Sequence, residues 1–224
     1  MIERIKHHQL YNQLSIWETL GSELLRPGGL TLTERALALC QLAPGAYVLD
    51  IGCGSGATLS MSARNGYTCI GVDHSPLLLW RGCAEHGQLP LLQAQAEQLP
   101  LADGVIDAVL AECSLSVMHN RAQVLSEIHR VLKPNGRLVI TDLYARNPDG
   151  LAELRRLSVD VCLSHAQSAQ QIHELLAAKQ LTVRHWEDHS ECLQTMTACG
   201  SGAAFWEQTA GVDPFDLQLA LARA

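Results

Sequence analysis

A strand that runs into a glycine-rich turn constrains the fold of this chain more than any other feature. Residues 48–51 read Val-Leu-Asp-Ile, typical of a short buried strand, and Gly52, Gly54 and Gly56 follow at every second position. Because glycine has no Cβ, such a turn can bend sharply and let a ligand lie against its amides. A helix is expected over residues 57–64. This order predicts the first unit of a nucleotide-binding type of α/β sheet.

Two ligands compete for this turn. The spacing Gly52-x-Gly54-x-x-Ala57 also fits the dinucleotide fingerprint, and Asp73 ends the next apolar run, where it could accept the ribose hydroxyls of either ligand. Asp50 separates the two, because a carboxylate next to the turn repels a pyrophosphate. S-adenosylmethionine carries an ammonium and a sulfonium instead, and residues 48–56 contain no Arg or Lys. The charges therefore favour the methyl donor over NAD.

The chain resembles class I S-adenosylmethionine-dependent methyltransferases from about residue 48 to residue 142. Five features match in order: Asp50 to Gly56, Asp73, Gln95-Ala96, the apolar run around Asp107, and the Leu-Lys-Pro-Asn-Gly turn at 132–136. The resemblance implies a doubly wound, mostly parallel, Rossmann-like α/β sheet with an N-terminal helical cap. It also implies S-adenosyl-L-methionine as cofactor and a small-molecule methyl acceptor.

The resemblance assigns the glycine turn and the residue after strand two to the donor. Asp50 would hold the turn and the donor's ammonium, and Asp73 the ribose. His74 would lie against the adenine ring. The turn itself consists of Gly52, Cys53, Gly54 and Gly56.

The resemblance places three further residues at the donor. Gln95 stands where the family usually has Asp, and its amide oxygen can accept the adenine amino group's hydrogen bond more weakly. Ala96 would offer its backbone amide to the ring, and Glu112 would line the channel near the sulfonium.

Two cysteines suggest a narrower alternative. Cys113 follows strand four and Cys162 lies in a later Val-Cys-Leu-Ser-His segment, and both positions resemble those of arsenite methyltransferases. Two thiolates can hold a thiophilic trivalent arsenic. The third cysteine of that branch has no convincing equivalent here, and buried small residues are the plain interpretation of both cysteines.

One domain over residues 1–224 is expected, with a helical cap at 1–43, a cofactor-binding core at 44–142 and a C-terminal region at 143–224. Strands are expected near 46–51, 68–73, 89–94, 105–111 and 136–142, and helices near 2–25, 31–42, 56–65, 76–86 and 120–132. The C-terminal region predicts helices near 149–163, 168–179 and 190–209 and a sixth strand at 181–186. Nothing after residue 214 resembles the family's closing antiparallel strand, so the sequence does not predict how that edge of the sheet is completed.

Composition narrows the function classes. No apolar run approaches the roughly 20 residues of a membrane span, and a net charge of −7 argues against a nucleic-acid partner. The start lacks the apolar core of a signal peptide. Eight scattered cysteines suit thiols in a reducing cytoplasm.

No metal site is expected. His185 and His189 would stand about 13 Å apart on a strand and could not share an ion.

Three functions remain open from the residues alone. Methyl transfer to a small acceptor leads, followed by a module that binds the donor without catalysis, and by a nicotinamide-dependent reductase. Neither the acceptor nor the oligomeric state can be read from the sequence.

Overall fold

The computed structural model describes residues 26–147, 149, 151–154 and 162–192. The helix expected over 2–25 and almost all of the one expected over 190–209 lie outside these residues. The chain divides into two compact units, which are described separately: residues 30–142 with 179–181, and the described parts of 1–29, 143–178 and 182–224. The expectation of one domain stays a prediction.

The first unit contains a five-stranded sheet in which every neighbouring pair is parallel. Its strands are β1 (Tyr47–Ile51), β2 (Thr68–Asp73), β3 (Leu91–Gln93), β4 (Ile106–Glu112) and β5 (Leu132–Thr141). The order β3-β2-β1-β4-β5 means that the chain builds outward from β1 in one direction and then returns to build in the other. Ligands of such sheets bind at this reversal, outside the carboxyl ends of the strands. The doubly wound α/β fold expected from the sequence is confirmed.

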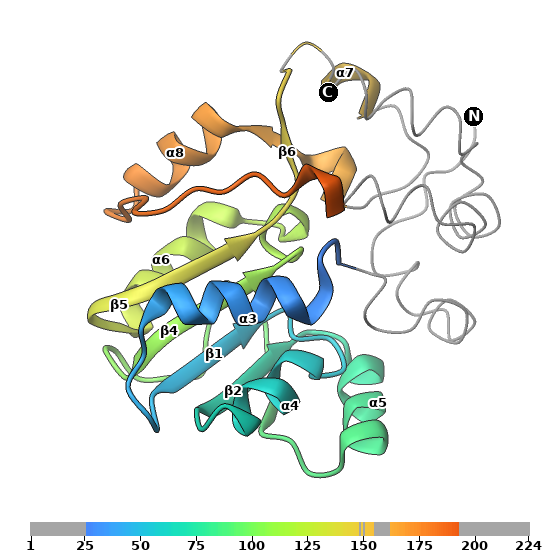
Figure 1. Ribbon diagram of the computed structural model, residues 1–224, viewed down its shortest axis with the longest axis vertical. Helices are drawn as coiled ribbons and strands as arrows, with labels where there is room; N and C mark the ends of the chain where they lie inside the picture. Colours follow the sequence, from blue (N-terminus) through green and yellow to red (C-terminus); the bar gives the residue numbers. More distant parts are fainter. Residues whose placement is uncertain (1–25, 148, 150, 155–161, 193–224) are drawn as a thin grey trace, which may run out of the picture. The chain divides into compact units, whose positions relative to one another are not determined.

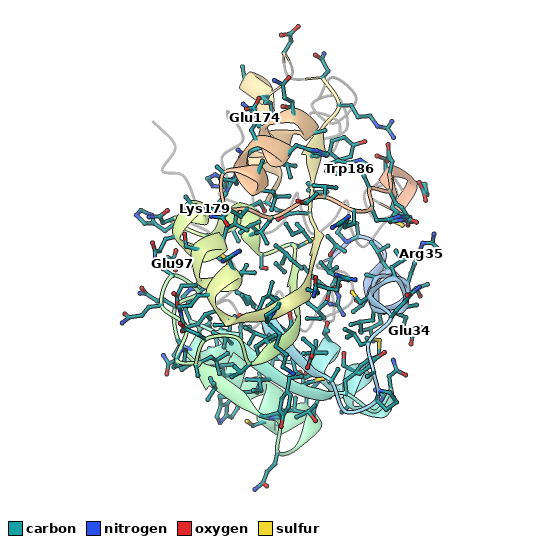
Figure 2. All side chains as sticks on the ribbon, turned by 90° about the vertical axis from the view of Figure 1, so that its left-hand side faces the viewer. Glu34, Arg35, Glu97, Glu174, Lys179 and Trp186 are labelled. Carbon is teal, nitrogen blue, oxygen red and sulfur yellow. The ribbon has the colours of Figure 1, made fainter. Side chains whose placement is uncertain are left out.

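Four helices belong to the sheet: α3 (Gly29–Cys40), α4 (Ala57–Arg64), α5 (Pro76–His86) and α6 (Arg121–Val131). Figure 1 shows α3 in front of the sheet and α6 behind it. The side chain of Asn120 caps α6 by accepting a hydrogen bond from the amide of Gln123 at 3.1 Å. Glu34 and Arg35 point outward from α3 (Figure 2). The helix begins at Gly29, two residues before the start expected from the sequence.

The core lies between the central strands and α6. Leu49, Val109, Leu125 and Ile128 have no exposed surface. Burial of each such side chain stabilises the fold by about 1.5–3 kcal/mol. Strands covered on both faces need continuous apolar runs, which is why β1 and β4 were recognisable in the sequence.

Strand β5 begins four residues earlier than expected. Leu132 pairs with Ile106, the register then shifts, and Arg137 pairs with Ala108. Asn135 takes a left-handed φ of 65° in the intervening residues. The Lys-Pro-Asn-Gly turn is therefore an irregularity within the strand's range rather than a loop before it.

The second unit departs most from expectation. Residues 181–189 have no regular secondary structure, so the sixth strand expected at 181–186 is wrong. Instead β6 (Tyr144–Ala145) and β7 (Gln167–Ser168) form a short parallel pair. The helix expected over 149–163 appears, among the described residues, as α7 (Leu151–Leu154) and a 3₁₀ turn, η3 (Cys162–His165), whereas α8 (Ala169–Ala177) confirms the helix expected at 168–179.

Side-chain contacts hold residues 181–189 in place within this unit. The ring of Trp186, labelled in Figure 2, lies 5.3 Å from that of Tyr144 and 5.2 Å from that of His173. Asp188 accepts hydrogen bonds from Tyr144 at 2.8 Å and from Arg146 at 2.6 Å. A β-prone sequence becomes a strand only where a neighbouring strand is available to pair with it.

Candidate cofactor-binding site

The glycine turn is fixed by backbone hydrogen bonds to the neighbouring strand. The amides of Gly52 and Cys53 both donate to the carbonyl of Val72, at 2.8 and 3.2 Å, and the amide of Gly56 donates to the carbonyl of Cys53 at 2.9 Å. Gly52, Gly54 and Gly56 have φ values of 73°, 56° and 82°. This left-handed region strongly favours glycine. The turn therefore has its shape before any ligand is considered.

Two glycines permit close packing around the turn. A Cβ on Gly52 would lie 2.6 Å from the Cβ of Ser114, in the loop after β4. A Cβ on Gly82 of α5 would lie 2.5 Å from the carbonyl oxygen of Ser55. Neither Ser114 nor Gly82 was expected at the site from the sequence, and a glycine inside a helical pattern was the available signal for Gly82.

Gly54 differs from these glycines in facing open space. A Cβ on Gly54 would meet no heavy atom within 4 Å. Two carboxylates flank this part of the turn, and the residues of both are buried, Asp50 at 5% exposure and Asp73 at 7%. Open space beside a residue without a Cβ, with two buried carboxylates nearby, fits a cationic ligand such as S-adenosylmethionine and does not fit a pyrophosphate.

Asp73 joins the end of β2 to the glycine turn. One carboxylate oxygen accepts a hydrogen bond from the amide of Gly54 at 2.9 Å, and the other accepts from the amide of Ser75 at 2.8 Å. Each oxygen of a carboxylate can accept a second hydrogen bond, so ribose hydroxyls can still be received. His74 is largely exposed, with its Nδ1 3.6 Å from Asp73.

Gln95 and Ala96 begin the loop between β3 and β4. The side chain of Gln95 is exposed, whereas Ala96 is buried. The carbonyl of Gln95 accepts a hydrogen bond from the amide of Gln98 at 3.1 Å, which closes a turn. The fold thus brings this loop to the same sheet edge as Gly54 and Asp73.

Glu112 ends β4 and has partners that the sequence did not reveal. Its two carboxylate oxygens accept hydrogen bonds from the hydroxyls of Thr33 on α3, at 2.6 Å, and Thr58 on α4, at 2.8 Å. Both threonines are almost completely buried. Glu112 therefore links two helices to the carboxyl edge of the sheet, and its expected place near the sulfonium stays a prediction.

The segment after β4 is strained and anchored. Cys113 has a left-handed φ of 49°, uncommon for a residue with a side chain, and its amide donates to the carbonyl of Thr141 at 2.7 Å. Ser114 donates to the carbonyl of Ile51 at 2.8 Å. The carboxylate of Asp142 accepts from both the amide and the hydroxyl of Ser116, at 2.9 and 2.8 Å. Strain of this kind commonly occurs at functional sites.

The cysteines have different environments. Burial raises the pKa of the Cys53 thiol far above its ordinary value, and the charges of Asp50 and Asp73 raise it further. Cys53 therefore contributes to the turn as a neutral thiol, not as a nucleophile. Cys113 belongs to the first unit and Cys162 to the second, so their joint action stays a prediction.

His185 and His189 lie in a segment without regular secondary structure, not on the strand from which their separation was expected. The Nε2 atoms of His185 and His189 lie 2.7 and 2.8 Å from the two carboxylate oxygens of Glu187. Potential ligand atoms of His189, Glu191 and Cys192 lie within 4.8 Å of one another, but Glu191 is exposed and the arrangement alone does not identify a metal site. In the described part of the chain, no helix is both long enough and apolar enough to cross a membrane.

Comparisons with known proteins agree with this geometry. A family model described as a methyltransferase domain matches residues 49–140. An uncharacterized methyltransferase of Synechocystis sp. is 36% identical over 46% of this chain and 50% of its own length, so the chain matches only half of that relative. A demethylmenaquinone methyltransferase of Mycolicibacterium vanbaalenii is 29% identical over 76% of this chain and 75% of its own length.

A solved structure shares the fold over nearly the whole chain. Phosphoethanolamine N-methyltransferase 2 of Haemonchus contortus, in complex with phosphomonomethylethanolamine and S-adenosylhomocysteine, has a TM-score of 0.68. It is 16% identical, over 96% of this chain and 53% of that one. These relatives do not support the arsenite alternative. Residues 49–140 thus match a methyltransferase domain, and the glycine turn and the strand order agree with those of class I S-adenosylmethionine-dependent methyltransferases.

Proposed function

We propose that this chain transfers the methyl group of S-adenosylmethionine to a small-molecule acceptor, from a donor site at the carboxyl edge of β1 to β4. The observation that carries the proposal is the open space beside Gly54, flanked by the buried carboxylates of Asp50 and Asp73. When bound there, the donor supplies an electrophilic methyl group on a positively charged sulfur.

The chain's own residues would bind and orient. Asp50 would hold the donor's ammonium and Asp73 its ribose, while His74, Gln95 and Ala96 would contact the adenine. The glycine turn, with Cys53 as a neutral member, would let the donor lie against the backbone at Gly54, where no Cβ intervenes. Much of the acceleration of a displacement reaction can come from fixing the geometry of the two reactants, so this site needs no dedicated base for a nucleophilic acceptor.

Cys113 is the residue of this unit that we propose for the acceptor side. It directly follows Glu112 at the end of β4, next to the reversal of strand order, and the hydrogen bond from its amide to the carbonyl of Thr141 anchors its backbone. A role for Cys162, which belongs to the other unit, stays a prediction. Neither assignment requires arsenic as the acceptor.

A small organic acceptor agrees with the charge of the chain. A net charge of −7 disfavours polyanionic partners, and the Mycolicibacterium relative is named for demethylmenaquinone. A reducing cytoplasm suits the seven free cysteines among the described residues.

The test combines binding with turnover. Isothermal titration calorimetry should detect binding of S-adenosylhomocysteine and much weaker binding of NAD. Release of S-adenosylhomocysteine is then measured with a panel of acceptors that includes demethylmenaquinone, phenols and thiols. Tighter binding of NAD would overturn the donor assignment. Donor binding without turnover on any acceptor would favour the module that binds without catalysis.

A further inference from the structure

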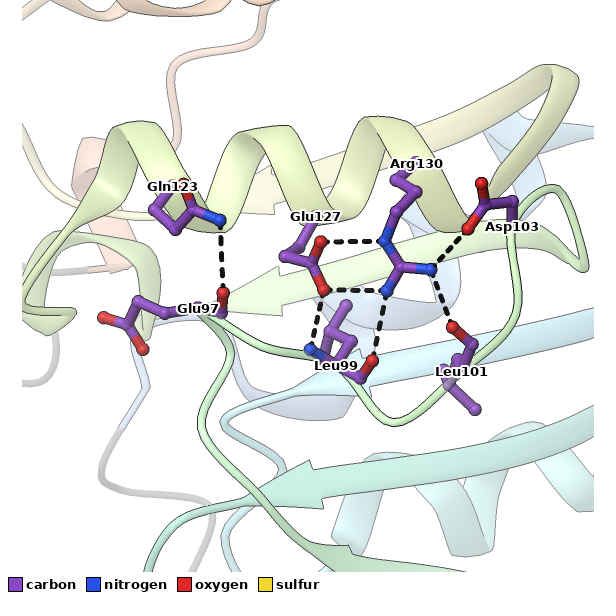
Figure 3. A network of polar contacts seen from close by, with 7 residues as sticks. All are labelled: Glu97, Leu99, Leu101, Asp103, Gln123, Glu127 and Arg130. Atoms are coloured by element: carbon purple, nitrogen blue, oxygen red, sulfur yellow. Dashed lines mark hydrogen bonds and ion pairs between the residues drawn. The ribbon is translucent and has the colours of Figure 1, made fainter.

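One arginine on α6 organises the loop that follows β3. The guanidinium of Arg130 donates twice to the carboxylate of Glu127, at 2.8 and 2.7 Å. It also donates to the backbone carbonyls of Leu99 at 3.1 Å and Leu101 at 2.7 Å, and to the carboxylate of Asp103 at 2.7 Å. Figure 3 shows these contacts converging on one side chain.

Glu127 completes the connection from the other side. One of its oxygens accepts from Arg130, and the second accepts both from Arg130 and from the amide of Leu99, the latter at 2.8 Å. Both the amide and the carbonyl of Leu99 are thus bound by the Glu127–Arg130 pair, and its side chain is 4% exposed. Hydrogen bonds to charged groups are stronger than neutral ones.

Two weaker contacts anchor Glu97, in the part of the loop that lies nearer to β3 in the sequence. Gln123 on α6 donates to the carbonyl of Glu97 at 3.4 Å, as drawn in Figure 3, and the amide of Asn120 donates to the Glu97 carboxylate at 3.1 Å. Gln95 and Ala96 directly precede these anchored residues. A loop without secondary structure that carries binding groups needs such support if those groups are to stay in place.

We infer that Arg130 and Glu127 are positioning residues for the adenine end of the methyl donor, acting through the backbone of residues 97–101. This inference rests on the proposed function, because it takes Gln95 and Ala96 as the adenine contacts. The planar fork of arginine satisfies several fixed acceptors at once, and lysine, a single flexible ammonium, cannot.

An ion pair at the opposite edge of the sheet provides a matched control. Lys133 lies 2.8 Å from the carboxylate of Asp107, near the starts of β5 and β4. The N–O distance in this pair is close to the 2.7 Å of the Arg130–Glu127 pair, and both pairs are partly exposed. Lys133 and Asp107, however, lie away from the first residues of the loop between β3 and β4. Loss of either pair should lower the melting temperature, and only loss of Arg130 should affect adenine recognition.

The experiment compares two ligands by calorimetry: S-adenosylhomocysteine and its analogue whose purine lacks the amino group. The wild-type chain should prefer the parent compound by about five- to tenfold, the value of one hydrogen bond. Arg130→Met and Arg130→Lys should weaken binding of the parent about tenfold and of the analogue about twofold, so that the preference falls towards one. Lys133→Met should change neither affinity more than twofold.

Equal weakening of both ligands in the Arg130 variants, or the same loss of preference in Lys133→Met, would overturn the positioning role. Glu127→Gln keeps an oxygen acceptor for Leu99 and supplies the same comparison if Arg130→Met fails to fold. A wild-type chain that binds neither ligand would instead refute the proposed function.

Discussion

The carboxylate of Asp73 accepts a hydrogen bond from the amide of Gly54 at 2.9 Å, across nineteen positions of sequence. This contact ties the end of β2 to the point where the glycine turn faces open space. One carboxylate therefore shapes the turn beside the proposed donor position, so its removal should affect both the turn and donor binding.

Asp73→Ala should weaken binding of S-adenosylhomocysteine by about 1.5–3 kcal/mol, the usual range for a hydrogen bond to a charged group. Calorimetry measures the change. Asp107→Asn, which alters a carboxylate bound to Lys133 at the other edge of the sheet, should leave the affinity unchanged. Unchanged binding by Asp73→Ala would show that Asp73 does not hold the ribose.

Thr58→Val should destabilise the chain by about 1–3 kcal/mol, because one oxygen of the Glu112 carboxylate loses its hydroxyl partner. Urea denaturation measures this free energy of unfolding. Thr31→Val is the control, since Thr31 lies on the exposed side of α3, and its effect should stay within about 0.5 kcal/mol. Equal effects would contradict the linking role of Glu112.

Cys53 should resist alkylation by iodoacetamide at pH 8 in the folded chain. Burial and two neighbouring carboxylates raise its pKa, and only the thiolate reacts. Cys83, exposed on α5, should be modified readily under the same conditions. Mass spectrometry of peptides distinguishes the two sites, and rapid modification of Cys53 would disprove the buried, neutral thiol.

The Glu127–Arg130 pair should contribute to stability at neutral pH and lose that contribution in acid. The hydrogen bond from Arg130 lowers the pKa of Glu127 below its ordinary value. The contribution is therefore complete above the unfolded pKa of about 4.3 and disappears as the pH falls through the lower pKa of the folded state. Glu127→Gln should be less stable than the wild type at pH 7, and the gap should narrow in strong acid.

Urea denaturation across this pH range measures that gap. Glu85→Gln is the control, because Glu85 pairs with Arg81 on the outside of α5, where an ion pair contributes little. A gap that stays constant with pH for Glu127→Gln would mean that the lowered pKa does not contribute to folding.

The sequence by itself determined the sheet and the donor turn. Strands buried on both faces require continuous apolar runs, and a left-handed turn requires glycine, so β1, β2, β4 and the residues 52–56 were readable from local pattern alone. The helices α4, α5 and α6 also fell within a residue or so of their expected bounds.

The tertiary structure alone decided the contacts between distant residues. Thr33 and Glu112 are 79 positions apart, and Arg130 and Leu99 are 31 apart. The spacing of polar side chains in a sequence does not show which residues they will contact, so these hydrogen bonds could not be predicted. The strand expected at residues 181–186 is also absent because of a long-range effect. The composition of these residues suits a strand, but a strand forms only beside a neighbouring strand edge, and only the folded chain determines where that edge lies.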